Sequence, residues 1–162
     1  MQSKNLVIFI TLFQYFMTCR SQSCPDNWIS GSSVGLGCLL FDTASPKAWL
    51  ESLDFCSENH NSHIIEIFNE QHQEYIMAKA LEIGIETGKK RNWWIGLTDE
   101  VSEGKWIWSH SQVEADFTFW LSTCPHPDDN RNYAYLYYGA NYQWMDGYIS
   151  SGSNYPICQF FP

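Results

Sequence analysis

The sequence predicts an α+β domain, and three observations lead to that prediction. Two segments with apolar residues at helical spacing come first, at 45–59 and 69–83. From Trp93 onward, short runs rich in tryptophan and tyrosine alternate with turn residues, which is typical of short strands. One long polar loop interrupts these strands between Trp108 and Tyr133. Helices followed by a group of strands indicate segregated α and β elements in a single layered domain.

The first 23 residues are predicted to be a secretory signal peptide. Lys4 precedes an apolar run of about a dozen residues, which is too short to span a bilayer. Small residues follow, and cleavage is expected after Ser21 or Ser23. The mature chain is therefore predicted to be secreted and to form one domain over residues 24–162, without a membrane span.

The net charge of the chain limits the kinds of partner that it is expected to bind. The chain has 9 basic and 18 acidic residues, a formal net charge of −9. Lys4 and Arg20 lie in the predicted signal peptide, so the mature domain is still more acidic. Nucleic acid and anionic membrane surfaces are therefore excluded as expected partners.

The N-terminal half is predicted to begin with a hairpin and a helix. Residues 24–41 contain a glycine-serine turn between two extended segments, and a Cys24–Cys38 bridge would close this hairpin. The helix at 45–59 is expected to start with Ser45 as N-cap and Pro46 in the first helical position. Its inward face is predicted to carry three residues: Trp49, Leu53 and Cys56.

A second helix follows a short extended stretch. Asn69 is expected to cap it, and Glu70 and Glu74 lie near the positive end of its dipole. Ile76, Ala80 and Ile83 are predicted to face the core, and a polar connection then leads to the strands.

One passage among the strands resembles a known family. The run WWIGLTDEVSEGKWIW, residues 93–108, resembles the central motif of C-type lectin-like domains. Other landmarks follow in the family's order: CPDNW, AWLESLDFC, WMD and YPICQF. The resemblance covers Cys24 to Phe160 and implies a double-loop fold with two helices, short antiparallel strands and a long ligand loop.

The resemblance also implies the disulfide pattern. Cys56 is expected to pair with Cys158, which would tie the first helix to the last strand. The family's second bridge, under the ligand loop, is lost at both ends, because Ala134 and Ile149 stand at its two positions.

In sugar-binding members of the family, calcium is held by a Glu-Pro-Asn or Gln-Pro-Asp triplet and by a Trp-Asn-Asp motif. A gapless count from Trp120 to Ala134 places CPH on the triplet, which removes both of its calcium ligands. A shift of two residues places HPD there instead, with Asp128 as a ligand. Both alignments remain open from the sequence.

At best three candidate calcium ligands therefore remain at the sugar site: Asp128, Asn132 and Asp146. Met145 replaces the family's asparagine, and a thioether is a poor ligand for a hard cation. Calcium dependence of sugar binding is consequently doubtful. The alternative for this stretch is a proline-stiffened surface loop.

The acidic turn TDEVSEG offers a second place for calcium. Asp99 and Glu103 match an accessory calcium site of the family, with Asn132 or Asp129 as partners from the long loop. The alternative is a solvated bend in which these carboxylates bind nothing.

Aromatic residues could form a platform for glycans. Tyr133, Tyr135 and Tyr137 alternate with Ala134, Leu136 and Tyr138, so one set should face the core. Trp144 is a further candidate ligand residue beside Asp128, Asn132 and Asp146. The alternative is that most of these rings, Trp144 included, are core.

The sequence thus predicts a secreted recognition protein that binds glycans, with a defence-related role as the family-level expectation. The alternative is a calcium-independent module that kept the fold and binds an extracellular protein. No motif of an enzyme is present, and the closely spaced His60 and His63 lack the spacing of a zinc site.

Cys124 is left over after the other cysteines pair. Three outcomes are open: a disulfide-linked dimer through Cys124, a buried or capped thiol in a monomer, and pairing with a retained Cys19.

Overall fold

The computed structural model describes residues 23–127 and 130–162. The predicted signal peptide, with Ser21 and Cys19, lies almost entirely outside the described residues. The prediction of an α+β domain is confirmed. The described elements are β1 (Ile29–Ser30), η1 (Ser32–Val34), β2 (Cys38–Phe41), α1 (Trp49–Glu58), β3 (His63–Ile64), α2 (Glu70–Thr87), β4 (Trp93–Thr98), β5 (Ile107–Trp108), β6 (Tyr133–Tyr137), η2 (Tyr138–Ala140), β7 (Gln143–Gly147) and β8 (Tyr155–Phe160).

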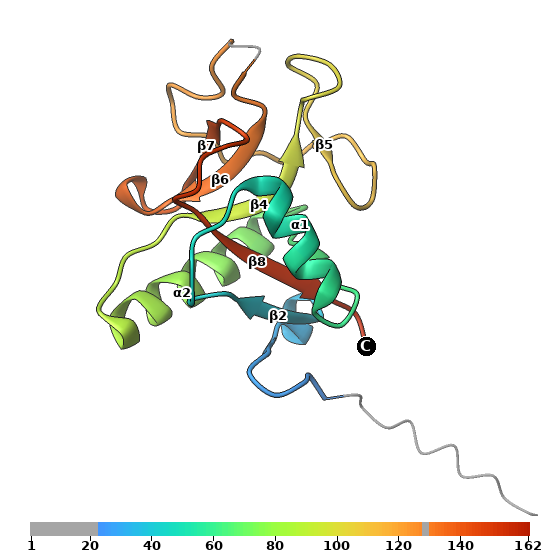
Figure 1. The fold of residues 1–162 in the computed structure, drawn as a ribbon, viewed down its shortest axis with the longest axis vertical. Helices are drawn as coiled ribbons and strands as arrows, with labels where there is room; N and C mark the ends of the chain where they lie inside the picture. The colour runs from blue at the N-terminus through green and yellow to red at the C-terminus, as the bar shows by residue number, and fades with distance from the viewer. Residues whose placement is uncertain (1–22, 128–129) are drawn as a thin grey trace, which may run out of the picture.

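The strands form one sheet in the order β1-β2-β8-β4-β6-β7, with β3 paired to β8 and β5 paired to β4 (Figure 1). The pairings are antiparallel except that β4 and β8 run parallel, with Trp93 opposite Tyr155. The last strand therefore lies in the middle of the sheet, next to strands from the beginning and from the centre of the chain.

The two helices cover opposite faces of this sheet. Side chains of β4 alternate, so that Trp93, Ile95 and Leu97 pack with Ile76 and Ala80 of α2. Trp94 points the other way and packs in a second cluster with Trp49 and Cys56 of α1. Figure 1 shows α1 in front of β8 and α2 behind it.

The predicted start of the first helix is wrong. α1 begins at Trp49, three residues after Pro46. The N–H of Lys47 donates to the carbonyl of Asn154 at 2.8 Å, which holds the preceding residues in an extended conformation. Ala48 takes the N-cap place, and its N–H is satisfied by the Glu51 carboxylate at 2.9 Å.

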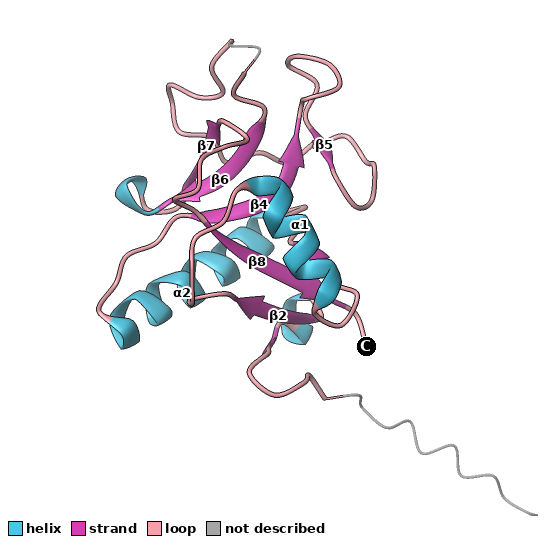
Figure 2. Ribbon diagram, viewed as in Figure 1, coloured by secondary structure: helices cyan, strands magenta, loops and turns pink. Residues whose placement is uncertain are grey.

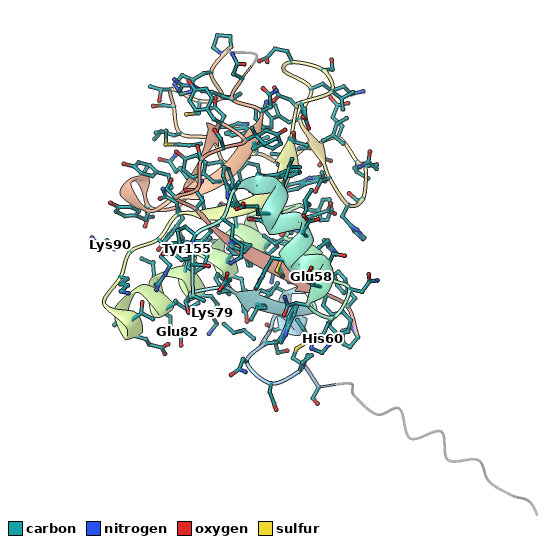
Figure 3. All side chains as sticks on the ribbon, viewed as in Figure 1. Glu58, His60, Lys79, Glu82, Lys90 and Tyr155 are labelled. Atoms are coloured by element: carbon teal, nitrogen blue, oxygen red, sulfur yellow. A yellow bond between two sulfur atoms is a disulfide. The ribbon has the colours of Figure 1, made fainter. Side chains whose placement is uncertain are left out.

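The second helix begins as predicted. The Asn69 side chain accepts from the N–H of His72 at 2.9 Å, and Ile76 and Ala80 are buried. α2 continues past the predicted end to Thr87 and stops at Gly88, whose φ of 64° is left-handed. Lys79 and Glu82 form an ion pair at 2.6 Å on the exposed side of the helix (Figure 3).

Both predicted disulfides are present, Cys24–Cys38 and Cys56–Cys158. Ala134, at one position of the missing family bridge, is completely buried. Cys124 is the free cysteine of the described residues.

The long loop between β5 and β6 is tied to β7 (Figure 2). The N–H of Trp144 donates to the carbonyl of Phe119 at 2.8 Å, and the N–H of Leu121 donates to the carbonyl of Trp144 at 2.9 Å. The ring of Trp120 packs edge-on against those of Trp106 and Trp144. These contacts bring residues 124–127 to the side of β7 that carries Asp146.

Candidate functional site

Asp146 is the centre of the candidate site. It lies on β7 opposite Ala134, and its side chain is 0% exposed. The backbone N–H of His126 donates to Asp146 Oδ2 at 3.0 Å. The imidazole Nδ1 of His126 lies 2.8 Å from Oδ1 and 3.1 Å from Oδ2. The buried carboxylate is thus compensated by one residue of the long loop.

Cys124 completes a cluster of three different ligand types. Its Sγ lies 3.8 Å from His126 Nδ1, and one ligand atom each of Cys124, His126 and Asp146 lies within 4.8 Å of the others. Burial, together with the neighbouring Asp146 carboxylate, raises the pKa of the Cys124 thiol above its ordinary value. At neutral pH and without a cation, the thiol therefore keeps its proton.

The geometry agrees with the gapless alignment of the loop. In that alignment Cys124 and His126 take the first and third positions of the family's triplet, and the structure brings both next to Asp146. Asp128 and Asp129 lie outside the described residues, so the shifted alignment's ligand has no described position. The contacts of Cys124 and His126 with Asp146 were not predicted, because the family motif supplies oxygen ligands, although the gapless alignment places both residues at the triplet.

The acidic turn is partly buried rather than fully solvated. Asp99 is 3% exposed, its Oδ2 accepts from the N–H of Gly104 at 2.9 Å, and its N–H donates to the Asn132 carbonyl at 3.2 Å. Burial raises the pKa of the Asp99 carboxyl, with a smaller contribution from Asp146. Asp99, Asn132 and Asp146 therefore lie at the same end of the sheet, whereas Glu103 is exposed on the turn.

The two possible calcium positions differ in chemistry. Beside Asp146, the described residues offer one carboxylate, a thiol and an imidazole, and this set does not fit a cation that prefers six to eight oxygens. At the turn, Asp99 Oδ1 is buried and has no hydrogen-bond partner among the described residues. A carboxylate oxygen in that state fits a calcium ligand, with Glu103 four residues further along the chain and the Asn132 backbone hydrogen-bonded to the Asp99 N–H.

The aromatic residues divide between core and surface. Trp144 is 0% exposed and donates from Nε1 to Gln73 Oε1 at 2.8 Å. Its ring has no surface on which a sugar could stack, so its prediction as a ligand residue is wrong and the core alternative describes it. The alternation along β6 is confirmed in part: Ala134 and Leu136 pack in the α2-side core, but Tyr133 on the other face is buried as well, in the cluster with Trp49.

A shallow depression lies directly beside Asp146. Its lining includes polar groups and two tyrosines, namely Asn92, Tyr135, Asp146, Tyr148 and Asn154. Tyr148 is 43% exposed, and the Arg131 guanidinium lies 5.2 Å from its ring centre. Polar side chains next to tyrosine rings are groups that can hydrogen-bond the hydroxyls and stack on the apolar face of a sugar.

The fold and this end of the sheet define a ligand-binding domain of the C-type lectin kind. The family profile described as Lectin C-type domain matches residues 45–160, and the chain belongs to this family. The family is a binding domain, and many of its members hold calcium.

Curated relatives support the assignment along most of the chain. The chain is 29% identical over 143 residues to human C-type lectin domain family 17, member A, covering 88% of this chain and 34% of that protein. It is 30% identical over 143 residues to chicken hepatic lectin, covering 87% of this chain and 60% of that protein. The chain thus spans about a third and three fifths of these two relatives.

Solved structures show the same fold. The carbohydrate-recognition domain of the mouse scavenger receptor C-type lectin matches with a TM-score of 0.70 and 26% identity, over 85% of this chain and 96% of that one. A calcium-independent type II antifreeze protein matches with a TM-score of 0.70 and 21% identity, over 86% and 95%. Within residues 23–127 and 130–162, no helix has the length and apolarity to cross a membrane.

Proposed function

We propose that the protein is a secreted recognition protein that binds glycans in the depression beside Asp146, without a calcium ion that bridges protein and sugar. It acts by binding and not by catalysis. The observation that carries the proposal is that the Asp146 carboxylate accepts hydrogen bonds from His126. In sugar-binding relatives, the aspartate at this position would bind calcium instead.

Ligand contacts would come from the depression itself. Tyr148 and Tyr135 supply rings, and Asn92 and Asn154 supply amides. Carbohydrate-recognition relatives with this fold support a glycan as the ligand class. A protein of the same fold is described as calcium-independent, which supports a binding site that works without calcium.

Calcium keeps a structural role in this proposal. Asp99, with Glu103 and Asn132, would hold one ion weakly at the acidic turn. The ion would there neutralise the buried charge of Asp99 and fix the turn, without contacting the glycan.

The proposal is tested with a glycan array probed first in millimolar calcium and then in chelator. We expect the same glycans to be bound in both buffers. Tyr148→Ala should lose binding, whereas Tyr138→Ala is a matched control, because Tyr138 has the same 43% exposure and lies outside the depression. Binding that vanishes in chelator would overturn the calcium-independent mode.

The alternative function is a protein-binding module that kept the fold. It is favoured by an exposed apolar patch formed by Leu81, Ile85 and Tyr138 around a second depression. An array that stays silent in both buffers, with Ile85→Glu abolishing capture of an extracellular partner, would support this alternative.

A disulfide-linked dimer through Cys124 remains a prediction about the assembly. Cys124 is half-buried and faces Asp146, so an interchain bridge would require the loop to turn its thiol outward. Non-reducing electrophoresis of the secreted protein beside Cys124→Ser distinguishes dimer from monomer.

A further inference from the structure

Three side chains of different chemistry converge at the loop side of β7. A calcium site of the family would use neither the thiol nor the imidazole among them. A thiol, an imidazole and a carboxylate come from Cys124, His126 and Asp146, and one ligand atom of each lies within 4.8 Å of the others. The set combines three kinds of metal ligand, one from each residue. The three groups are those that bind Zn²⁺ in proteins.

The distances are close to those of a tetrahedral zinc site. With Zn–S of about 2.3 Å and Zn–N or Zn–O of about 2.05 Å, tetrahedral geometry separates sulfur from nitrogen by roughly 3.6 Å and nitrogen from oxygen by roughly 3.3 Å. Cys124 Sγ and His126 Nδ1 are 3.8 Å apart, and Nδ1 lies 2.8 and 3.1 Å from the two Asp146 oxygens. The Sγ–Nδ1 distance would therefore change by about 0.2 Å and the Nδ1–Oδ1 distance by about 0.5 Å, while Sγ and the Asp146 oxygen, which lie within 4.8 Å of each other, would come to roughly 3.6 Å.

The surroundings hold the ligands in place. Asp146 Oδ2 accepts the backbone N–H of His126 at 3.0 Å, which leaves Oδ1 to bind a metal through one oxygen. The N–H of Cys124 donates to the Leu121 carbonyl at 2.8 Å, and Leu121 is itself bonded to Trp144 of β7. Two of the ligands are thus positioned by hydrogen bonds that the metal need not break.

The ligand types select zinc over calcium. Calcium prefers many oxygens, whereas thiolate and imidazole favour Zn²⁺ among the abundant divalent ions. His126 is 32% exposed and Cys124 is half-buried, so one side of the cluster is open to solvent. A fourth position is therefore accessible to water or to a donor from a ligand.

We propose that Cys124, His126 and Asp146 bind one Zn²⁺ ion, at the place where sugar-binding relatives hold calcium, with water in the fourth position. Cys124 coordinates as the thiolate, and its proton passes to the buffer. His126 coordinates through Nδ1, so the metal replaces the hydrogen bond between Nδ1 and Asp146 Oδ1, and the neutral imidazole carries its proton on Nε2. The ion fixes the long loop to β7. The proposal does not depend on glycan binding, because the three ligands are all supplied by the protein.

The experiment uses the full secreted chain, stripped of metal with a chelator under non-reducing conditions. Zn²⁺ or Co²⁺ is added and the protein is desalted. We expect one zinc retained per chain, and with Co²⁺ an absorption band from thiolate-to-cobalt charge transfer that zinc abolishes. Millimolar calcium should not displace the ion. Zinc should also shield Cys124 from alkylation.

Variants identify the ligands. Cys124→Ser and His126→Gln should each weaken zinc binding by more than about 100-fold, since the loss of outer-shell partners alone costs 10–100-fold. His110→Gln is the control, because His110 is exposed, stacks on His63 and lies outside the cluster. Unchanged disulfides and thermal unfolding midpoints of the apo proteins would show that the variants fold.

Two results would overturn the proposal. One is a chain that retains no zinc, or retains it equally in Cys124→Ser and His126→Gln. The other is a Cys124 that is recovered in an interchain disulfide. Because no glycan enters these measurements, a failure here is distinguishable from failure of the proposed glycan site.

Discussion

At Asp146, the neighbouring residue types decide which ion the loop can accept. The aspartate alone is compatible with calcium or zinc, but a thiol and an imidazole stand where oxygen ligands would be needed for calcium. The sequence predicted Asp146 as a candidate ligand residue, and the structure places it beside Cys124 and His126. It could not predict the contacts of Cys124 and His126, because the two alignments of the loop differ by a shift that only tertiary contacts decide.

Asp99 offers a test of the structural calcium at the acidic turn. Its carboxyl pKa is raised by burial, so without a cation the ionised form is less favourable in the folded protein than in the unfolded chain. We expect Asp99→Asn to be at least as stable as the parent protein in chelator, because asparagine can still accept from Gly104. Calcium at tenfold its Kd should stabilise the parent by about 1.4 kcal/mol and the variant not at all. Thermal unfolding with and without calcium measures both. A variant that is clearly less stable in chelator would show that the Asp99 charge is already compensated by protein groups.

Because the pKa of His63 is lowered, we expect the protein to lose stability in mild acid. Burial lowers its pKa, the charge on the stacked His110 lowers it further, and Glu66 and Gln159 oppose the shift. Between this lowered pKa and the ordinary value near 6.5, the unfolded chain binds more protons than the folded protein. The stability contributed by neutral His63 is therefore complete above about pH 6.5 and is lost as pH falls through that window. Denaturant unfolding from pH 7.5 to 5 should show the decline, and His63→Gln should reduce it, with a remainder from His72, whose pKa is also lowered by burial. The same slope in the variant would assign the effect to other groups.

At the scale of elements, the two helices show what local signals can and cannot predict. Asn69 and the apolar spacing gave the start of α2 correctly, because the cap is a contact between residues three apart. The start of α1 was wrong, because Lys47 pairs with Asn154, more than a hundred residues away. Ser45 and Pro46 are residues that commonly start a helix, but the backbone hydrogen bond between Lys47 and Asn154 prevents the helix from starting there.

The cap of α2 is itself testable. Asn69→Ala removes the acceptor for the His72 N–H and should cost about 1 kcal/mol of unfolding free energy. Asn69→Asp retains the acceptor and should cost much less. Urea unfolding of the three proteins provides the comparison, and equal losses in both variants would mean that the side chain contributes by something other than capping.

At the scale of the molecule, the order of elements was predictable and the sheet topology was not. The alternation along β6 is a local pattern in the sequence, whereas β4 is apolar along its length and is buried on both faces, so its two sides could not be assigned from the sequence. The placement of β8 between β2 and β4, including its parallel pairing with β4, depends on contacts between the ends and the centre of the chain. The family resemblance implied short antiparallel strands, and neither it nor the strand periodicity predicted the parallel pair.

The last prediction concerns the two disulfides, which close loops of very different size. Cys56–Cys158 spans 102 residues and ties α1 to the central strand β8, whereas Cys24–Cys38 spans 14 residues within the first hairpin. In the chain-entropy model, a loop of about 100 residues stabilises by about 4.7 kcal/mol and one of about 15 residues by about 3 kcal/mol. Replacing both cysteines of the long loop by alanine should therefore cost about 1.7 kcal/mol more than the same change in the short loop. Cys56, Cys158 and Cys38 are all at most 1% exposed, so cavity costs partly cancel in the comparison. Guanidinium unfolding of the two double variants under identical conditions gives the difference. A short-loop variant that is equally or more destabilised would show that native contacts of the hairpin, and not the entropy of the unfolded chain, set the ranking.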